Sequence, residues 1–145
     1  MPDESLKRLI LVIDQNPDHG ETMRQVLADQ SDRYHLQVID SGEAAIAWVQ
    51  SPERVPSEAR PDLILLDLHL PNQASFTILT TLKGNADWRR IPVIMLSESG
   101  QTDDVFQSYF HQGNCYIVKS RHPQQLAAMI QQIESFWLEI VTLPT

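Results

Sequence analysis

An unbroken apolar run ends in an acid at Leu63-Ile64-Leu65-Leu66-Asp67. A short run without polar residues at alternate positions is typical of a strand that is covered on both faces. Two further segments repeat the pattern, because the mostly apolar 8–13 is followed by Asp14 and 91–96 is followed by Ser97. These three segments predict a parallel sheet with helices above and below it.

Two less apolar segments complete a predicted set of five strands. Segment 34–38 alternates between polar and apolar residues, which is typical of an edge strand with one wetter face. Segment 115–118 is short and is followed by Lys119. Helical patterns and capping residues predict helices at about 17–30, 41–50, 75–83, 102–113 and from 123 onward, with Ser41 as the N-cap of the second. Five strand–helix repeats predict a doubly wound α/β domain.

Length and composition limit the class of protein. The chain has 145 residues, of which 42% are hydrophobic and 21% are charged, and this fits one globular domain. Its net charge of −8 argues against binding to nucleic acid or to an anionic membrane. The longest apolar run is too short to span a bilayer, and a single cysteine cannot form an internal disulfide. We therefore expect a cytoplasmic protein without nucleic acid or membrane partners.

Four chemically matched side chains follow the predicted strands, namely Asp14, Asp67, Ser97 and Lys119. In open parallel sheets, functional sites form at the carboxyl ends of the strands. Two carboxylates, a hydroxyl and an ammonium at one rim can hold a divalent cation, accept a phosphoryl group and neutralise its charge. A strand can also end in a polar residue simply because the chain reaches water there. Four strands that all end in chemically matched side chains favour a functional site over that simpler explanation.

With these residues in place, the chain resembles the CheY-like receiver domains of two-component response regulators. The order and spacing of four stretches carry the resemblance: 10–17, 61–71, 91–97 and 114–119. The long loop at 51–61, the stretch at 114–117 and the pair Phe136-Trp137 resemble more narrowly the cyanobacterial regulators that partner phytochrome kinases. The resemblance implies a flavodoxin-like domain over 1–134, with a five-stranded parallel sheet in the order 2-1-3-4-5 and five helices.

The resemblance also implies a role for each matching residue in phosphoryl chemistry. Asp67 would accept a phosphoryl group from a histidine kinase, and the narrower resemblance implies one of phytochrome type. Ser97 would hydrogen-bond that group, and Lys119 would pair with it. Tyr116 would be an aromatic switch that turns inward when Ser97 moves, although an aromatic residue on an edge strand is more often simply packed.

The implied cofactor is Mg²⁺, held by Asp14, Asp67 and the backbone carbonyl of His69. The family usually has two adjacent carboxylates at the first strand end, whereas this chain has Asp14 followed by Gln15. A neutral amide oxygen is a poorer ligand for Mg²⁺ than a carboxylate, so we expect weakened binding. Glu98 stands after the hydroxyl, where the family usually has a small residue, and it could crowd and repel a phosphoryl group.

We therefore expect a stand-alone response regulator that signals by protein contact or by passing its phosphoryl group on. It would not be an enzyme beyond self-phosphorylation and self-dephosphorylation. The alternative, favoured by Gln15 and Glu98, is a pseudo-receiver that binds proteins without being phosphorylated. An independent enzyme such as a phosphatase ranks third.

Two further expectations concern the end of the chain and the histidines. Apolar residues continue beyond the expected receiver domain into 135–145, and such a concentration usually marks an interface. We expect a homodimer through this extension, in preference to packing within one chain. The histidines show no metal-ligand spacing, and we expect each of them at the surface or in a loop: His19, His35, His69, His111 and His122.

Overall fold

The computed structural model describes residues 8–28, 34–51, 60–86, 88–97, 115–118 and 122–133. Within these ranges five strands form one parallel sheet in the order β2-β1-β3-β4-β5, which confirms the predicted strand order. The strands are β1 (Arg8–Ile13), β2 (Tyr34–Ile39), β3 (Leu63–Asp67), β4 (Val93–Ser97) and β5 (Cys115–Val118). Strand order reverses beside β1, so the carboxyl ends of β1 and β3 flank the position where such folds place their sites.

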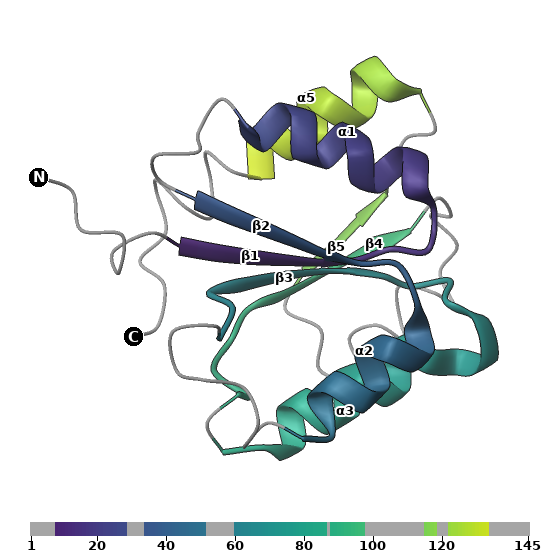
Figure 1. Ribbon diagram of the computed structural model, residues 1–145, viewed down its shortest axis with the longest axis vertical. Coiled ribbons are helices and arrows are strands. Elements are labelled where there is room, and N and C mark those ends of the chain that lie inside the picture. The colour runs from purple at the N-terminus through teal and green to yellow at the C-terminus, as the bar shows by residue number, and fades with distance from the viewer. Residues whose placement is uncertain are drawn as a thin grey trace, which may run out of the picture.

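Four α-helices in the described ranges cover the two faces of this sheet: α1 (Pro17–Ala28), α2 (Gly42–Val49), α3 (Ala74–Gly84) and α5 (Pro123–Ile133). Figure 1 shows α1 and α5 side by side on one face, and α2 and α3 on the other. The helix predicted at 102–113 lies outside the described residues, so four of the five predicted helices are confirmed. None of the helices in the described ranges is long and apolar enough to cross a membrane.

The core is divided into two clusters by the alternation of side chains along the central strands. On β1, Leu11 and Ile13 pack toward α2 and α3, whereas Ile10 and Val12 pack toward α1 and α5. Every residue of β3 and β4 is buried. Because both faces of these strands are covered, their sequences contain no polar residue before the last position.

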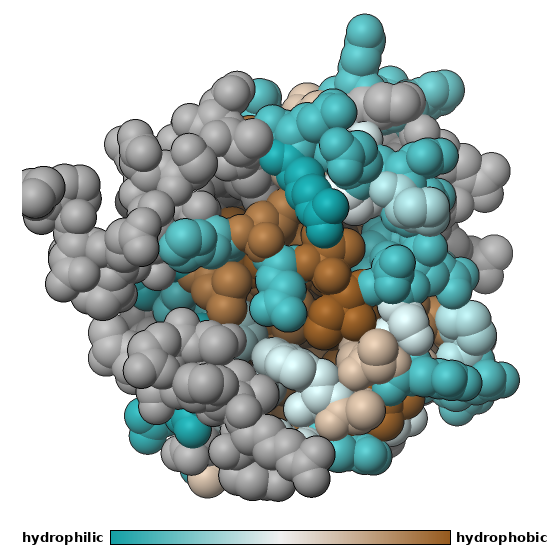
Figure 2. Space-filling view, in the orientation of Figure 1, coloured by the Kyte–Doolittle hydropathy of each residue, from teal (hydrophilic) through white to brown (hydrophobic). Residues whose placement is uncertain are grey.

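Strand β2 lies at the edge of the sheet, as its alternating sequence predicted. His35 and Gln37 are exposed, whereas Leu36 and Val38 are partly buried against the cluster under α1. Figure 2, in the same orientation, shows apolar side chains gathered between the two helical layers, with polar side chains around them. The wetter face of this strand is therefore the one that carries His35 and Gln37.

The connection from α3 to β4 is held by a lysine. The Nζ of Lys83 donates to the carbonyl oxygens of Arg89, at 3.2 Å, and of Ile91, at 3.1 Å. Partial burial lowers the pKa of the Lys83 ammonium, because removal from water disfavours the charged form. These contacts fix the segment that leads into β4 and so toward Ser97.

The connection from β3 to α3 is held by a buried serine. The hydroxyl of Ser75 donates to the carbonyl oxygen of Asp67 and accepts from the backbone N–H of Leu70, at 3.3 Å. In the intervening 3-10 turn, η4 (Pro71–Gln73), the last two residues have φ angles of 58° and 57°. Such left-handed conformations are unfavourable for residues other than glycine. The two bonds of Ser75 therefore offset part of the strain in the turn that follows Asp67.

Helices α2 and α3 approach each other closely at their amino ends. Ser41 caps α2, as predicted, by accepting from the N–H of Ala44 at 3.2 Å. The next residue is Gly42, and a Cβ atom added there would lie 2.9 Å from the Cβ of Ala74, the first residue of α3. A glycine is therefore required at this position for packing.

We predict that Ser75→Ala lowers the free energy of unfolding by about 1–3 kcal/mol, because two hydrogen bonds in a fully buried position are lost. Thr77→Ala is the matched control, since its hydroxyl bonds to a backbone carbonyl at an exposed site and should cost at most about 0.5 kcal/mol. Urea unfolding followed by circular dichroism measures both values. Equal values for the two variants would show that the bonds of Ser75 do not stabilise the turn.

We predict that Gly42→Ala destabilises the fold by about 1–3 kcal/mol, because α2 and α3 must move apart. Gly84→Ala is the control: a Cβ there meets nothing within 4 Å, and the substitution should gain up to about 1 kcal/mol in helix propensity. Thermal unfolding can be followed by tryptophan fluorescence, since the rings of Trp48 and Trp88 are packed with centroids 4.6 Å apart. A Gly42→Ala protein as stable as the parent would exclude the close contact.

Candidate functional site

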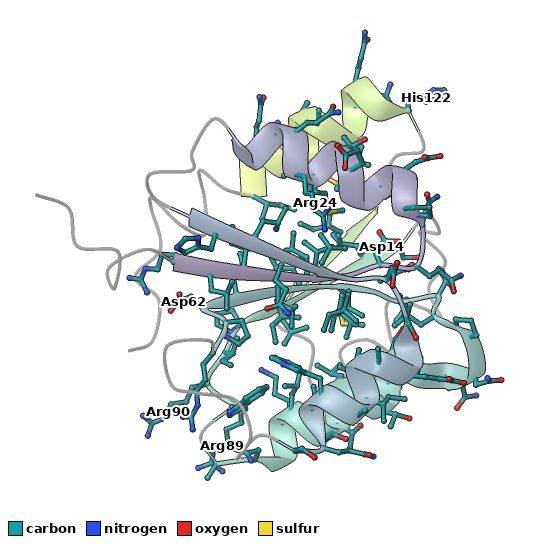
Figure 3. The ribbon with its side chains drawn as sticks, viewed as in Figure 1. Asp14, Arg24, Asp62, Arg89, Arg90 and His122 are labelled. Carbon is teal, nitrogen blue, oxygen red and sulfur yellow. The ribbon has the colours of Figure 1, made fainter. Side chains whose placement is uncertain are left out.

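The register of the sheet brings the predicted site residues to one level. Strands β1 and β3 pair in parallel up to residues 13 and 66, so Asp14 and Asp67 stand at adjacent strand ends. On the other side of β3, Ser97 follows the residue of β4 that pairs with Asp67. Figure 3 shows Asp14 at this end of the sheet and Asp62 at the opposite end. The sheet therefore gathers two carboxylates and a hydroxyl at the carboxyl ends of three neighbouring strands.

All three of these side chains are buried: Asp14 is 1% exposed, Asp67 is 6% exposed and Ser97 is 0% exposed. Backbone donors support both carboxylates, because Asp14 Oδ1 accepts from the N–H of Asn16 at 2.9 Å and Asp67 Oδ1 accepts from the N–H of His69 at 3.0 Å. A buried carboxylate is costly unless hydrogen bonds or a cation compensate its charge. Two of them at adjacent strand ends form a site that attracts a cation.

The oxygen ligands at these strand ends suit Mg²⁺. Asp14 and Asp67 supply two carboxylates, and Gln15 is exposed and carries only a neutral amide. Within the described ranges no group of three His, Cys, Asp or Glu side chains gathers closely enough to hold a metal ion. Mg²⁺ in proteins often takes only one or two carboxylates and completes its shell with water and phosphate oxygens. An all-oxygen set with two carboxylates fits such a hard cation.

Some of the predicted residues lie partly or wholly outside the part of the chain that the structure describes. Tyr116 lies in β5, where its backbone pairs with Met95, but its side chain is outside the described part of the structure. Lys119 and Glu98 lie outside the described residues, as does the extension at 135–145. The roles expected for these residues remain predictions.

The structure adds a contact at the site that the sequence analysis missed. The Nε2 atom of His69 lies 2.7 Å from the Oγ of Ser97 and is hydrogen bonded to it. The resemblance had assigned only the backbone carbonyl of His69 to the site. Local sequence patterns give no signal for this contact, because His69 lies in the turn after β3 and Ser97 is 28 positions away.

The prediction that every histidine lies at the surface or in a loop is wrong for His19. This residue lies in α1 and is only 7% exposed. Its Nδ1 is 3.8 Å from Asp14 Oδ2, and its Nε2 is 3.3 Å from the Nδ2 of Asn16. The amino end of α1 is folded back over Asp14, and this arrangement buries the imidazole. His35, His69 and His122 are exposed, as expected.

Comparisons with known proteins agree with this geometry. The family model of the response regulator receiver domain matches residues 10–131. Response regulator Rcp1 from Synechocystis sp. is 41% identical over 145 residues, which cover 99% of this chain and 99% of that protein.

Solved structures of response regulators are also similar to this chain. The phosphorylated cyanobacterial phytochrome response regulator RcpA superposes with a TM-score of 0.87 at 34% identity, over 96% of this chain and 99% of that one. The Mn²⁺-bound form of response regulator Rcp1 superposes with a TM-score of 0.83 at 40% identity, over 95% of this chain and 99% of that one. The chain belongs to the family of response regulator receiver domains and is of the cyanobacterial phytochrome-associated type.

Proposed function

We propose that this protein is a phosphorylation-dependent signalling receiver in which Asp67 accepts a phosphoryl group from a histidine kinase. The observation that carries the proposal is the position of Asp67, a buried carboxylate at the central strand end, between Asp14 on one side and Ser97 on the other. The kinase proposed is of the phytochrome type, on the strength of the similarity to RcpA. The proposed setting is the cytoplasm.

The chemistry proposed is transfer of a phosphoryl group from nitrogen to oxygen. A carboxylate oxygen of Asp67 attacks the phosphorus of a phosphohistidine, the P–O bond forms and the P–N bond breaks. The bonding electron pair leaves with the imidazole of the kinase, which takes up a proton from water. The N–H of His69 orients the carboxylate through Oδ1. Ser97 and Lys119 would bind the oxygens of the transferred group.

Mg²⁺, when bound, would neutralise the negative charge that gathers as the phosphate and the carboxylate approach each other. Asp14, Asp67 and the backbone carbonyl of His69 are the groups proposed to hold it. Without a second carboxylate at the end of β1, the site should bind Mg²⁺ less tightly than a receiver that has one.

A pseudo-receiver remains the second candidate, and one observation favours it: the residue beside Asp14 is an exposed glutamine. Such a protein would keep the fold and bind its partner without phosphorylation. The two candidates differ in one measurable property, which is whether the wild-type chain gains phosphate on Asp67.

We predict that the wild-type protein, incubated with Mg²⁺ and acetyl phosphate, gains the mass of one phosphoryl group, and that Asp67→Asn abolishes the gain while leaving the circular dichroism spectrum unchanged. Asp40→Asn is the matched control, because Asp40 is an exposed aspartate that follows β2 at the same end of the sheet. It should be phosphorylated like the wild type. A gain that persists in Asp67→Asn would exclude Asp67 as the acceptor, and no gain in the wild type would favour the pseudo-receiver.

We predict that Gln15→Asp tightens Mg²⁺ binding, because a charged oxygen replaces a neutral one. Without metal the variant should be slightly less stable than the parent, since clustered carboxylates repel one another. With saturating Mg²⁺ the order should reverse, because ligand binding stabilises the folded state. Calorimetry and melting curves measure these changes. Gln131→Asp, on the exposed face of α5, adds the same charge elsewhere and should leave Mg²⁺ affinity unchanged.

Equal affinity of the parent and Gln15→Asp would show that Gln15 does not weaken the site. In that case the main argument for a pseudo-receiver is lost, and another group supplies the missing oxygen.

We further propose that the chain forms a homodimer through its extension at 135–145. Deletion of the residues after Ser135 should give a monomer at micromolar concentration, whereas the full chain should sediment as a dimer. The expected cause is the loss of the apolar residues that follow Ser135. A full-length protein that sediments as a monomer would contradict this proposal.

A further inference from the structure

His69 contacts both residues that the proposed phosphoryl chemistry needs. Its backbone N–H donates to Asp67 Oδ1 at 3.0 Å, and its imidazole Nε2 is hydrogen bonded to Ser97 Oγ at 2.7 Å. The first contact supports the acceptor carboxylate. The second engages the hydroxyl that would have to reach the phosphoryl group.

Which group donates in the second contact depends on the tautomer of the imidazole. With the ring proton on Nδ1, Nε2 accepts and the Ser97 hydroxyl donates to it. The single proton of that hydroxyl is then used by the imidazole.

We propose that His69 is a positioning residue whose imidazole holds the Ser97 hydroxyl in a hydrogen bond until a phosphoryl group on Asp67 displaces the imidazole. A serine hydroxyl has one proton, so it cannot donate to the imidazole and to a phosphoryl oxygen at the same time. When Asp67 is phosphorylated, a phosphoryl oxygen must therefore replace the imidazole as the acceptor of this hydroxyl proton. His69 thereby lowers the affinity of the site for a phosphoryl group and shortens the lifetime of the phosphorylated state.

The surroundings of His69 permit this exchange. Ser97 is fully buried, whereas His69 is exposed and its ring can move into water. When the imidazole is released, its ring nitrogens can therefore form hydrogen bonds with water. The proposal rests on the proposed function, because it concerns the same acceptor site.

Beryllofluoride, a stable mimic of a phosphoryl group, tests the proposal by titration in the presence of Mg²⁺. His69→Ala should bind it more tightly than the wild type by about two- to tenfold, the weight of one hydrogen bond. The phosphoryl group on Asp67 should also be lost more slowly in this variant. His35→Ala removes an exposed histidine from the edge strand β2 and should behave like the wild type.

A double-mutant cycle separates this role from a merely structural one. In a Ser97→Ala background, His69→Ala should have no effect on beryllofluoride affinity, because the bond between the two side chains is already absent. Nitrogen chemical shifts of the His69 ring report the bond directly. They should change when Ser97 is replaced by alanine and when beryllofluoride is added to the wild type.

Each outcome has a distinct meaning. If His69→Ala binds beryllofluoride no better than the wild type, or if its effect persists without the Ser97 hydroxyl, the positioning role is excluded while the proposed function stands. Weaker binding by His69→Ala would also exclude it and would assign the opposite tautomer, with His69 donating to Ser97. If neither the wild type nor His69→Ala binds beryllofluoride, the proposed function fails, and the competition at Ser97 fails with it.

Discussion

Parallel pairing of β1, β3 and β4 is the constraint on which the site depends. In a parallel sheet, strands that start in register also end in register, so their last residues share one rim. Burial on both faces excludes polar side chains from these strands until the rim is reached. Asp14, Asp67 and Ser97 stand at the first positions where the chain can carry a functional group. The chemistry of the site therefore follows from where the hydrophobic runs stop.

The loops that follow β3 and β1 orient the side chains that the sheet brings together. After β3, the chain turns through two residues with positive φ and is held by the bonds of Ser75 before α3 begins. That turn sets the direction of His69, whose N–H meets Asp67 and whose ring meets Ser97. After β1, the start of α1 folds back and brings His19 close to Asp14. The acids are thus oriented by hydrogen bonds from the loop backbone, in addition to the sheet.

Much of the fold could be predicted from the sequence because hydrophobic periodicity reports burial directly. The strand runs at 8–13, 63–66 and 91–96, the edge position of 34–38 and the capping role of Ser41 all follow from local patterns. Strand order came from the family resemblance, since periodicity alone does not specify which strands are neighbours. Contacts across the site could not be predicted, because they depend on loop dihedral angles that sequence patterns do not encode. The contact between His69 and Ser97, 28 positions apart, is of this kind.

The division of the core by the sheet has a consequence for how this protein can diverge. Among the residues that the structure describes, the side chains beneath α1 and α5 form one buried cluster and those beneath α2 and α3 form another. Energetic effects of substitutions in separated clusters are approximately additive. Each layer can therefore accumulate replacements under its own selection, so one helical surface can adapt to a new binding partner without requiring compensatory changes on the opposite side of the molecule.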